Sequence, residues 1–552
     1  MLNSKNNDRL IDILFLLTSV VLLFVFLGRD SIYGPEARCA IIAREMLLNS
    51  DFFHPTIAGM GYFDKPLLTY WIIAFFSAIS GVVNEWTVRI PSAIAGLVTL
   101  FATIMLGKKL WSAQVGKLAG WIALSTYGLL FWSRVGTAEA ENLVAIILAV
   151  TWYFLKRDNL NFKFFLVFYL ITFVGALTKG LTAIVIPVLI VGIDMIDNKK
   201  WKELFKTPHF IALAIGIIVY LSSFAYSSMT APATYDENGI VDVFKENVLR
   251  YTNPYDHKQP VYYYLYYLPF LILPWAPMFF AAFSGMLTRW KTLDKNSKWL
   301  IKSIAVIFLF FTFCGSRRGH YMLCMIPLCS LLISIFWIYL KDNKIDIFKR
   351  IGNIAQAAFF GFILLLEFLA PVILYFLNFK CSTTFIIVTE SAAIIMLVLG
   401  IYFYFSKPRK TILAFVLMAL IITGTFFLYQ SILLDTYASM RSLAFNIKTE
   451  MPNIEPERIA FYRSENTNVD FYLDTKRPVR VLENEKDLEK FLENKEPLVL
   501  IVKKNYLSGE LAGFSGKLNS CKKIEEQLDP WRARSEREQN KKLVVFFVDE
   551  AI

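Results

Sequence analysis

The chain has few charged residues, and this scarcity excludes a soluble multidomain protein. Only 18% of its 552 residues are charged, whereas 56% are hydrophobic and the mean hydropathy is +0.49. Many apolar runs approach the length needed to cross a bilayer. The composition therefore predicts an all-α polytopic membrane protein.

Disulfide and metal-binding patterns are missing as well. The six cysteines, at positions 39, 314, 324, 329, 381 and 521, show no CxxC or Cys/His spacing and predict no disulfide framework. The four histidines are scattered at positions 54, 209, 257 and 320, so no zinc site is implied. No internal repeat or low-complexity segment stands out.

Apolar runs dominate the first part of the chain. Candidate spans lie at roughly 10–28, 66–82, 88–107, 116–133, 142–155, 164–178, 181–196, 209–227, 261–284, 299–315, 320–340, 353–378, 383–405 and 411–434. No small-residue cleavage site follows the first run, which we expect to be a retained anchor. The net charge of +12 comes from basic residues at the ends of these runs. This is typical of an inner-membrane protein and does not point to nucleic acid.

Six basic clusters fall in alternate loops, so a single orientation places all of them in the cytoplasm. They are Lys108, Lys109 and Lys117; Lys156, Arg157 and Lys163; Lys199, Lys200, Lys202 and Lys206; Arg289, Lys291, Lys295 and Lys298; Lys341, Lys344, Lys349 and Arg350; and Lys407, Arg409 and Lys410. The N-terminal Lys5 and Arg9 share that side if residues 66–82 lie along the interface as a juxtamembrane helix. About thirteen crossings then remain.

In this orientation the loops at 29–87, 134–141, 228–260 and 316–319, and everything after about 435, face the periplasm or exterior. Basic residues on that face oppose the insertion rule, and an anionic ligand at the outer membrane surface would explain them. The non-clustered charges gathered there are Glu36, Arg38, Asp64, Lys65, Arg134, Glu139, Glu141, Lys179, Arg250, Arg317, Arg318 and His320.

At about Thr436 the composition changes from apolar to polar, which predicts two parts, residues 1–435 and 436–552. Short apolar runs at Arg458–Tyr462, Val479–Leu482, Leu498–Val502 and Leu543–Val548 alternate with helical stretches such as Glu485–Leu492. The pattern predicts a small α/β domain on the outer side, in which we find no catalytic motif.

The loop at 29–87 is the strongest candidate for a site that handles an anionic lipid. Pro35 followed by Glu36 predicts the start of a helix. Glu36 either complements the helix dipole or faces a reaction centre. Asp64 and Lys65 either anchor the interfacial helix as a pair, or Lys65 binds a lipid phosphate, which is the role we favour.

Other outer segments offer further candidates. Glu141, which begins a helix, is a better candidate than Glu139, which could be incidental. Lys179 either snorkels to the interface or binds an anion. In the segment SRRGHY, either Arg317 or Arg318 could bind phosphate oxygens together with Tyr321, while the other arginine makes structural pairs. The loop at 228–260 supplies further candidates, namely Glu246, Asn247, Arg250, Tyr251 and His257.

These segments together resemble the GT-C glycosyltransferases that use polyprenyl-phosphate sugars, a superfamily that includes protein O-mannosyltransferases and lipid A aminoarabinose transferases. The likeness is greatest to the bacterial aminoarabinose transferases. Their pattern is an acidic residue, ARYAEIAREM, YFEKPPLxYW, an LDP-like acidic site, TKG, an ExxxRF-like loop and a late basic–Tyr–Pro segment. Between residue 10 and about 435 this chain reads PEARCAIIAREM, YFDKPLLTYW, AEAEN, TKG, ENVLRY and SRRGHYMLCMIP. The first two motifs are specific in combination.

The resemblance implies a GT-C frame of spans and juxtamembrane helices with a periplasmic C-terminal domain. It implies that the donor phosphate is bound by Arg38, Lys65, Lys179, Arg250 and Tyr321, with Arg317 or Arg318 assisting. Glu36, Asp64 and Glu141 would shape or catalyse the acceptor side, and Asn247, Tyr62 and His320 would contact the substrate.

Four positions depart from the family pattern. Pro35 stands where the usual first aspartate lies, Asp64 replaces a glutamate, Glu141 replaces an aspartate, and Asn247 stands where a histidine often appears. The SRRGHY segment also differs from the KGKLPTY-like form. These departures favour the superfamily over a particular sugar and acceptor.

We therefore expect an inverting glycosyltransferase that moves a sugar from polyprenyl phosphate, such as undecaprenyl phosphate, to an envelope glycolipid such as lipid A. Glu36, or Asp64 in second place, would be the general base. Basic residues and Tyr321 would stabilise the departing phosphate. A divalent metal could bind between carboxylates but is not expected to be obligatory. We expect a monomer in the bacterial inner membrane, with its site and C-terminal domain on the periplasmic side.

The sequence is also compatible with other functions. A transferase of the same fold could act on protein or on another glycan. An oligosaccharyltransferase is less well supported, because no WWD-type signature is present. A lipid or solute transporter would need charges near the membrane midplane and inverted repeats, whereas the unusual charges of this chain lie at one face.

Overall fold

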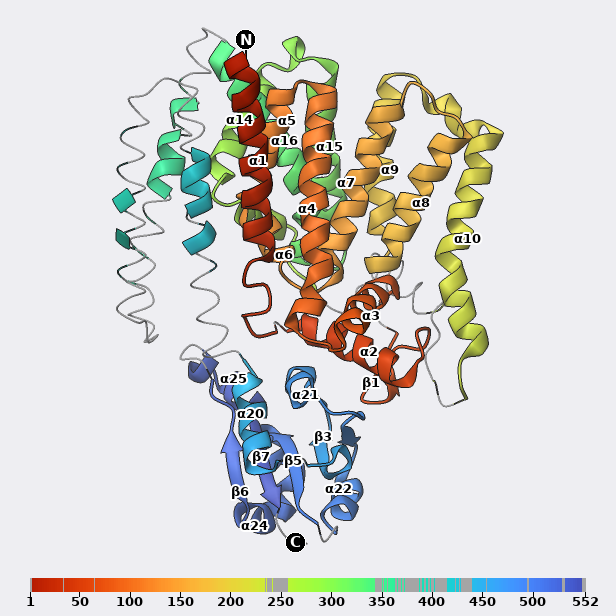
Figure 1. Cartoon of the computed structure of the whole chain (residues 1–552), viewed down its shortest axis with the longest axis vertical. Coiled ribbons are helices and arrows are strands. Elements are labelled where there is room, and N and C mark those ends of the chain that lie inside the picture. The colour runs from red at the N-terminus through yellow and green to blue at the C-terminus, as the bar shows by residue number, and fades with distance from the viewer. Residues whose placement is uncertain are drawn as a thin grey trace.

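The computed structural model describes residues 2–32, 34–63, 65–233, 235, 241, 257–342, 439–452, 454–493, 496–528 and 532–548, with short runs and single positions between 350 and 427. These residues form a bundle of long helices with a smaller α/β region below one end of it (Figure 1). Two shorter helices lie between the bundle and the α/β region.

The helices of the bundle follow the apolar runs of the sequence. They are α1 (Leu2–Phe24), α4 (Glu85–Leu110), α5 (Ala113–Leu124), α6 (Tyr127–Trp132), α7 (Ala138–Lys156), α8 (Phe162–Lys179), α9 (Thr182–Asp197), α10 (Thr207–Thr230), α13 (Tyr263–Leu271), α14 (Ala276–Thr288), α15 (Lys295–Thr312) and α16 (Ile326–Asp342). Polar side chains cap several of them: Asn84, Ser112, Asn161 and Asp294 each accept a hydrogen bond from a backbone N–H of the first turn.

The chain is a multi-pass membrane protein. Among the described residues, five helices are long and apolar enough to cross a membrane, or six if one bent pair counts as a span. The expected number of about thirteen crossings stays a prediction. The candidate spans at 353–378, 383–405 and 411–434 lie largely outside the described residues.

Two of the expected continuous spans are broken. The run at 116–133 divides into α5 and α6, because Thr126 leaves the helix and its hydroxyl caps α6 at Leu129 N. The run at 261–284 divides into α13 and α14, and the direction of the chain bends by 114° between the two helices. Pro274 lies at this bend, where its missing N–H and its ring interrupt a helix.

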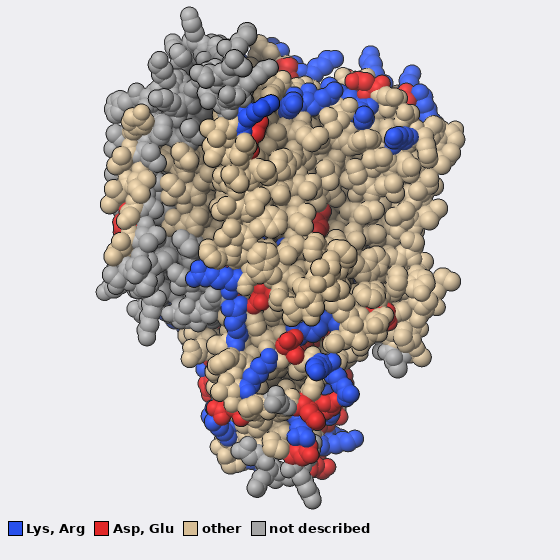
Figure 2. All heavy atoms as spheres, in the orientation of Figure 1, with Lys and Arg blue, Asp and Glu red and all other residues tan. Residues whose placement is uncertain are grey.

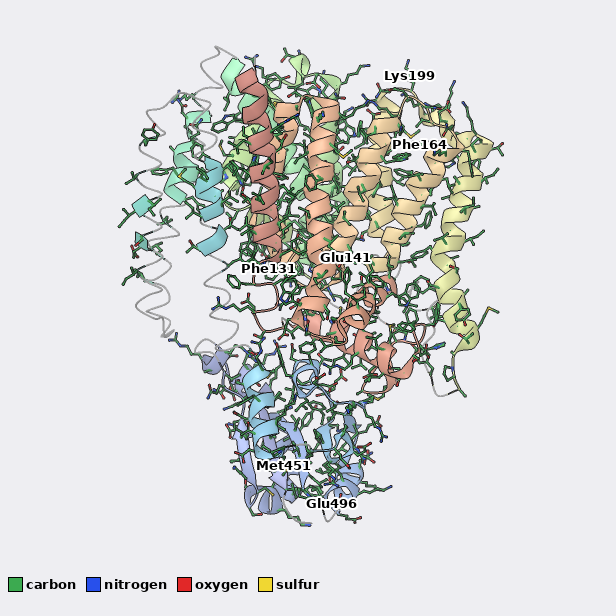
Figure 3. The ribbon with its side chains drawn as sticks, in the orientation of Figure 1. Phe131, Glu141, Phe164, Lys199, Met451 and Glu496 are labelled. Carbon is green, nitrogen blue, oxygen red and sulfur yellow. The ribbon has the colours of Figure 1, made fainter. Side chains whose placement is uncertain are left out.

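The charges separate into two zones. On the face shown in Figure 2, Lys, Arg, Asp and Glu gather at the upper end of the bundle and over the lower region, with a mostly uncharged belt between them. Figure 3 places Lys199, from a predicted cytoplasmic cluster, at the upper end, and Glu141, a predicted site residue, toward the lower end. The two predicted faces therefore lie at opposite ends of the bundle.

The predicted interfacial segment at 66–82 forms α3 (Leu68–Ser80), which lies with α2 (Pro35–Asn49) below the ends of the long helices (Figure 1). A hairpin of β1 (Thr56–Ile57) and β2 (Met60–Gly61) connects them. The Glu45 carboxylate of α2 holds this hairpin, accepting bonds from Thr56 Oγ1 at 2.5 Å, Ala58 N at 2.8 Å and Gly59 N at 3.2 Å.

The C-terminal region contains a five-stranded mixed sheet in the order β4-β3-β5-β7-β6. Its strands are β3 (Ile459–Tyr462), β4 (Arg480–Leu482), β5 (Leu498–Lys503), β6 (Lys522–Glu525) and β7 (Leu543–Val548), and its helices include α20 (Arg441–Glu450), α21 (Thr467–Leu473), α22 (Glu485–Leu492), α23 (Lys504–Leu507), α24 (Ser515–Asn519) and α25 (Glu536–Lys541). Four strands and α22 were predicted. The edge strand β6 was not, because its sequence, KKIE, is polar.

The α/β region docks on α2 through α21. Arg44 donates to the backbone oxygens of Asp470 at 3.3 Å and Phe471 at 2.8 Å. The Tyr472 hydroxyl accepts a bond from Ile32 N at 2.7 Å and donates to Glu85 at 3.2 Å. The helix that begins the candidate site is therefore fixed from below by the C-terminal region.

Candidate active site

Three elements that are distant in sequence meet at the lower ends of α7 and α8. Lys179, the last residue of α8, forms an ion pair with Glu139 in the first turn of α7. His320 Nε2, from the 3-10 helix Gly319–Met325, lies 3.4 Å from the other Glu139 oxygen. The Lys179 ammonium lies 4.9 Å from the centroid of the Tyr321 ring. These side chains form one connected group.

A small cavity adjoins this group. Its volume is about 20 Å³, so it has room for one water-sized group. It is lined by Glu139, Asn142, Leu143, Ile146, Lys179, Thr182, Phe311, His320, Tyr321, Leu323 and Cys324. A single oxygen of a ligand fits there, whereas a sugar ring would have to lie outside it.

The surroundings of this group are positively charged. Lys65 and Arg318 both lie within electrostatic range of Lys179 and His320. The carboxylate of Glu139 contacts Lys179 and His320, and Lys65 and Arg318 add positive charge around these two residues. An excess of cations in a site largely shielded from water favours an anionic ligand.

The structure distinguishes the two neighbouring arginines, which the sequence could not separate. Arg317 donates to backbone oxygens, to Thr312 O at 2.9 and 3.1 Å and to Gln259 O at 2.6 Å. It therefore joins α15 to the chain before α13. Arg318 lies on the side of Lys179 and His320. The geometry favours Arg318 as the ligand-binding residue and Arg317 as the structural one.

Arg38 and Tyr62 form a second part of the site. Arg38 donates to the Tyr62 hydroxyl at 2.6 Å, and its guanidinium lies 6.0 Å from the centroid of that ring. The Cys39 thiol lies within electrostatic range of Arg38, Glu36, Glu141 and Lys65, which links the two parts. Burial raises the pKa of Cys39 to about 12 against the lowering effect of Arg38, so the thiol is no nucleophile at neutral pH.

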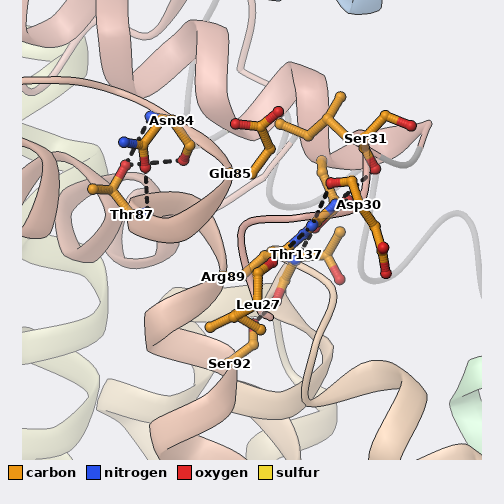
Figure 4. Close-up of polar contacts among 12 residues, drawn as sticks. Leu27, Asp30, Ser31, Asn84, Glu85, Thr87, Arg89, Ser92 and Thr137 are labelled. Carbon is orange, nitrogen blue, oxygen red and sulfur yellow. Dashed lines mark hydrogen bonds and ion pairs between the residues drawn. The ribbon is translucent and has the colours of Figure 1, made fainter. Parts of the chain in front are cut away.

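Glu36 makes a buried ion pair that the sequence did not reveal. Arg89 in α4 donates to both Glu36 oxygens at 2.9 Å, and Gly136 N donates to one of them at 2.5 Å. Figure 4 shows Arg89 reaching back to the loop of Leu27, Asp30 and Ser31, whose backbone oxygens accept its remaining bonds. Arg89 lies inside the expected span at 88–107, where an arginine needs a partner of opposite charge. This position was the feature of the sequence that could have indicated the ion pair.

Glu141 is placed differently from Glu36. One of its oxygens accepts a bond from Ser92 Oγ at 3.0 Å, whereas the other is buried with no hydrogen-bond partner among the described residues. The residue is 7% exposed. A buried carboxylate with one oxygen available can accept a proton, or a hydrogen bond from a hydroxyl group.

Three predicted site residues, Asp64, Asn247 and Arg250, lie outside the described residues. Within the part of the chain that is described, no three His, Cys, Asp or Glu side chains gather where they could hold a metal ion. The expectation of no obligatory metal stays a prediction.

The helical bundle, the two helices below it and the basic group at the helix ends define the class: this is a GT-C fold. A crystal structure of ArnT from Cupriavidus metallidurans bound to undecaprenyl phosphate aligns over 97% of both chains, with a TM-score of 0.75 and 16% sequence identity. The same transferase in the apo state aligns over 97% of both chains, with a TM-score of 0.72 and 18% identity. At these identities the likeness shows the fold.

Sequence relatives point to the same superfamily. A family model described as dolichyl-phosphate-mannose-protein mannosyltransferase matches residues 64–226. An undecaprenyl phosphate-α-4-amino-4-deoxy-L-arabinose arabinosyl transferase from Pseudomonas fluorescens is 28% identical over 55% of this chain and 56% of its own length. One from Shewanella sediminis is 27% identical over 62% of each chain. The chain thus spans about half the length of the first relatives it matches, and the resemblance predicted from the motifs is confirmed.

Proposed function

We propose that the protein is an inverting glycosyltransferase that moves a sugar from a polyprenyl phosphate, above all undecaprenyl phosphate, to an envelope glycolipid such as lipid A. The observation that carries the proposal is the group of Lys65, Lys179, Arg318 and His320 at one end of the bundle. The names of the relatives, which are arabinosyl transferases for undecaprenyl phosphate-linked sugars, support it.

The cations would act on the leaving group. In the reaction an acceptor oxygen forms a bond to the anomeric carbon while the bond from that carbon to the phosphate oxygen breaks, and the lipid phosphate departs with the electron pair. Lys65, Lys179 and Arg318 stabilise the charge that develops on this phosphate. Tyr321, stacked against Lys179, limits the directions in which the ammonium can point. A single displacement inverts the anomeric carbon.

A carboxylate would take the proton of an acceptor hydroxyl. Both carboxylate oxygens of Glu36 accept hydrogen bonds from Arg89, an arrangement that suits a structural residue holding α2 in place. Glu141 keeps one buried oxygen available and is our first choice among the described residues, with Asp64 as the other candidate. A phosphate acceptor is already ionised, and the carboxylate would then orient it.

We place the protein in the bacterial inner membrane, with the site and the α/β region on the periplasmic side. The basic clusters at the upper end of the bundle support this orientation, because such clusters remain in the cytoplasm. The sugar donor would then be used in the outer leaflet, next to an envelope acceptor.

The test is transfer of labelled sugar by the protein in nanodiscs that contain radiolabelled undecaprenyl-phosphate sugars and extracted envelope lipids. The variants are Lys179→Ala and, as a control, Lys206→Ala, because Lys206 pairs with Glu203 away from the site. Label should reach the lipid fraction with wild type and the control but not with Lys179→Ala. The transferase proposal would be refuted if the wild-type protein left every one of the labelled undecaprenyl-phosphate sugars intact, or if it only moved the donor from one leaflet to the other.

A protein acceptor is the second candidate, because the matched family model describes protein mannosyltransferases. The same assay separates the two acceptors when an envelope protein extract is supplied beside the lipids. Label in protein and none in lipid would favour the second candidate.

A further inference from the structure

Glu139 occupies the centre of the proposed phosphate site. Its two carboxylate oxygens face Lys179 and His320, and 11% of its side chain is exposed. Lys65 and Arg318 add positive charge around the same point. From the sequence alone Glu139 could be incidental, but the structure places this internal anion where an external one is expected to bind.

Two anions compete for Lys179 in this arrangement. The Lys179 side chain is 13% exposed, and its ammonium is already in contact with Glu139. A phosphate that approaches it must share the cation with the carboxylate or replace it. Two negative charges a few ångströms apart repel more strongly in a partly buried site than in water, so replacement is favoured over sharing.

We propose that Glu139 is an internal counter-anion, displaced from Lys179 when the donor phosphate binds and returning to Lys179 when the product phosphate leaves. This inference rests on the proposed function. Only non-covalent contacts change: Lys179 exchanges a carboxylate for a phosphate, and no bond is made or broken. His320 gives the displaced carboxylate a second partner, since it already lies 3.4 Å away and is itself held by Trp132, 5.0 Å between ring centroids.

The need for such an anion follows from the charges of donor and product. The donor is a phosphodiester with one negative charge, whereas the product is a monoester with about −1.5 to −2 at pH 7. The cations therefore hold the product more strongly than the donor. A carboxylate that competes for Lys179 weakens the binding of both and opposes retention of the product. Glu139 would then set the balance between donor capture and product release.

The test compares wild type with Glu139→Gln, which removes the charge and keeps the size, and Glu139→Asp, which keeps the charge. Glu203→Gln is the matched control, since Glu203 also pairs with a lysine, Lys206, but at the opposite end of the bundle. The measurements are the dissociation constant of undecaprenyl phosphate in nanodiscs, the kcat and KM of transfer, and the thermal transition that reports folding.

Glu139→Gln should bind undecaprenyl phosphate at least about tenfold more tightly, a difference of about 1.4 kcal/mol, and should lower KM and kcat together. Glu139→Asp and Glu203→Gln should remain close to wild type in affinity. Unchanged or weaker binding by a folded Glu139→Gln protein would overturn the inference, because Glu139 would then only position Lys179. Absence of binding by wild type would instead overturn the proposed function and, with it, this inference.

Discussion

The ion pair of Glu36 and Arg89 allows a sharp test of whether Glu36 is structural or catalytic. Glu36 is 0% exposed, and Arg89 is 4% exposed. Truncating one partner of such a pair leaves a buried charge uncompensated, which costs about 3–5 kcal/mol. Arg89→Met also removes the donor for three backbone oxygens, so its cost should lie at the upper end of that range.

The double variant Glu36→Met/Arg89→Met should be less destabilised than the two single variants predict. No buried charge remains in it, and the coupling between the two changes should be about 2–3 kcal/mol, within the range for residues in direct contact. The assay is denaturation by SDS in mixed micelles, followed by tryptophan fluorescence, for wild type, both single variants and the double variant.

Sugar transfer is measured on the same samples. A structural Glu36 predicts that activity falls in proportion to the folded fraction and partly returns in the double variant. A Glu36→Gln protein with wild-type stability, intact donor binding and no transfer would refute this reasoning and identify Glu36 as the base.

Three further predictions concern other parts of the molecule. Arg318→Ala should weaken undecaprenyl phosphate binding about tenfold, as expected for a lost charged hydrogen bond, whereas Arg317→Ala should lower thermal stability and leave the affinity of folded protein unchanged; the reverse pattern would contradict the assignment. Burial raises the pKa of Asp470 from 3.8 to about 7 and that of Glu465 from 4.5 to about 7. The folded protein therefore favours the protonated carboxyl groups, and docking of α21 on α2 should weaken as the pH rises from about 4 to about 7 and change little above that. Hydrogen exchange across α21 at pH 5 and pH 8 measures this effect, and Asp470→Asn should flatten the dependence; equal protection of wild type at both values would count against it. Treatment with EDTA should leave transfer unchanged, and an activity restored by added divalent cations would show a metal requirement.

Elements defined by local composition could be predicted from the sequence. The strands β3, β5 and β7 are continuous apolar runs between polar segments, which is typical of buried strands, and α3 carries the aromatic residues of an interfacial helix. The polar sequence of β6 hides a strand that needs only one neighbour, at the edge of the sheet. Pro274 could have indicated the bend between α13 and α14 but was outweighed by the apolar run.

The candidate site was predictable as a set of residues and less so as a geometry. Lys65, Lys179 and Tyr321 stood out because charges and phenols at span ends are costly or functional. Glu139, the partner of Lys179, did not, since this contact joins residues 40 positions apart. Arg317 and Arg318 are adjacent, and their roles depend on which one meets the oxygen of Gln259, 58 positions away. Tertiary contacts of this kind leave no local pattern.

The docking of α21 on α2 has a consequence for the synthesis of the protein. The contacts of Arg44 join residues 426 and 427 positions apart. Because domains fold as units in the order in which the ribosome makes them, α2 remains without these partners until most of the chain has emerged. The helix that carries Arg38 therefore acquires its final support late in biogenesis. A nascent chain that stops before α21 would reach the membrane with its helices inserted and this helix uncovered, a state that quality-control proteases can recognise.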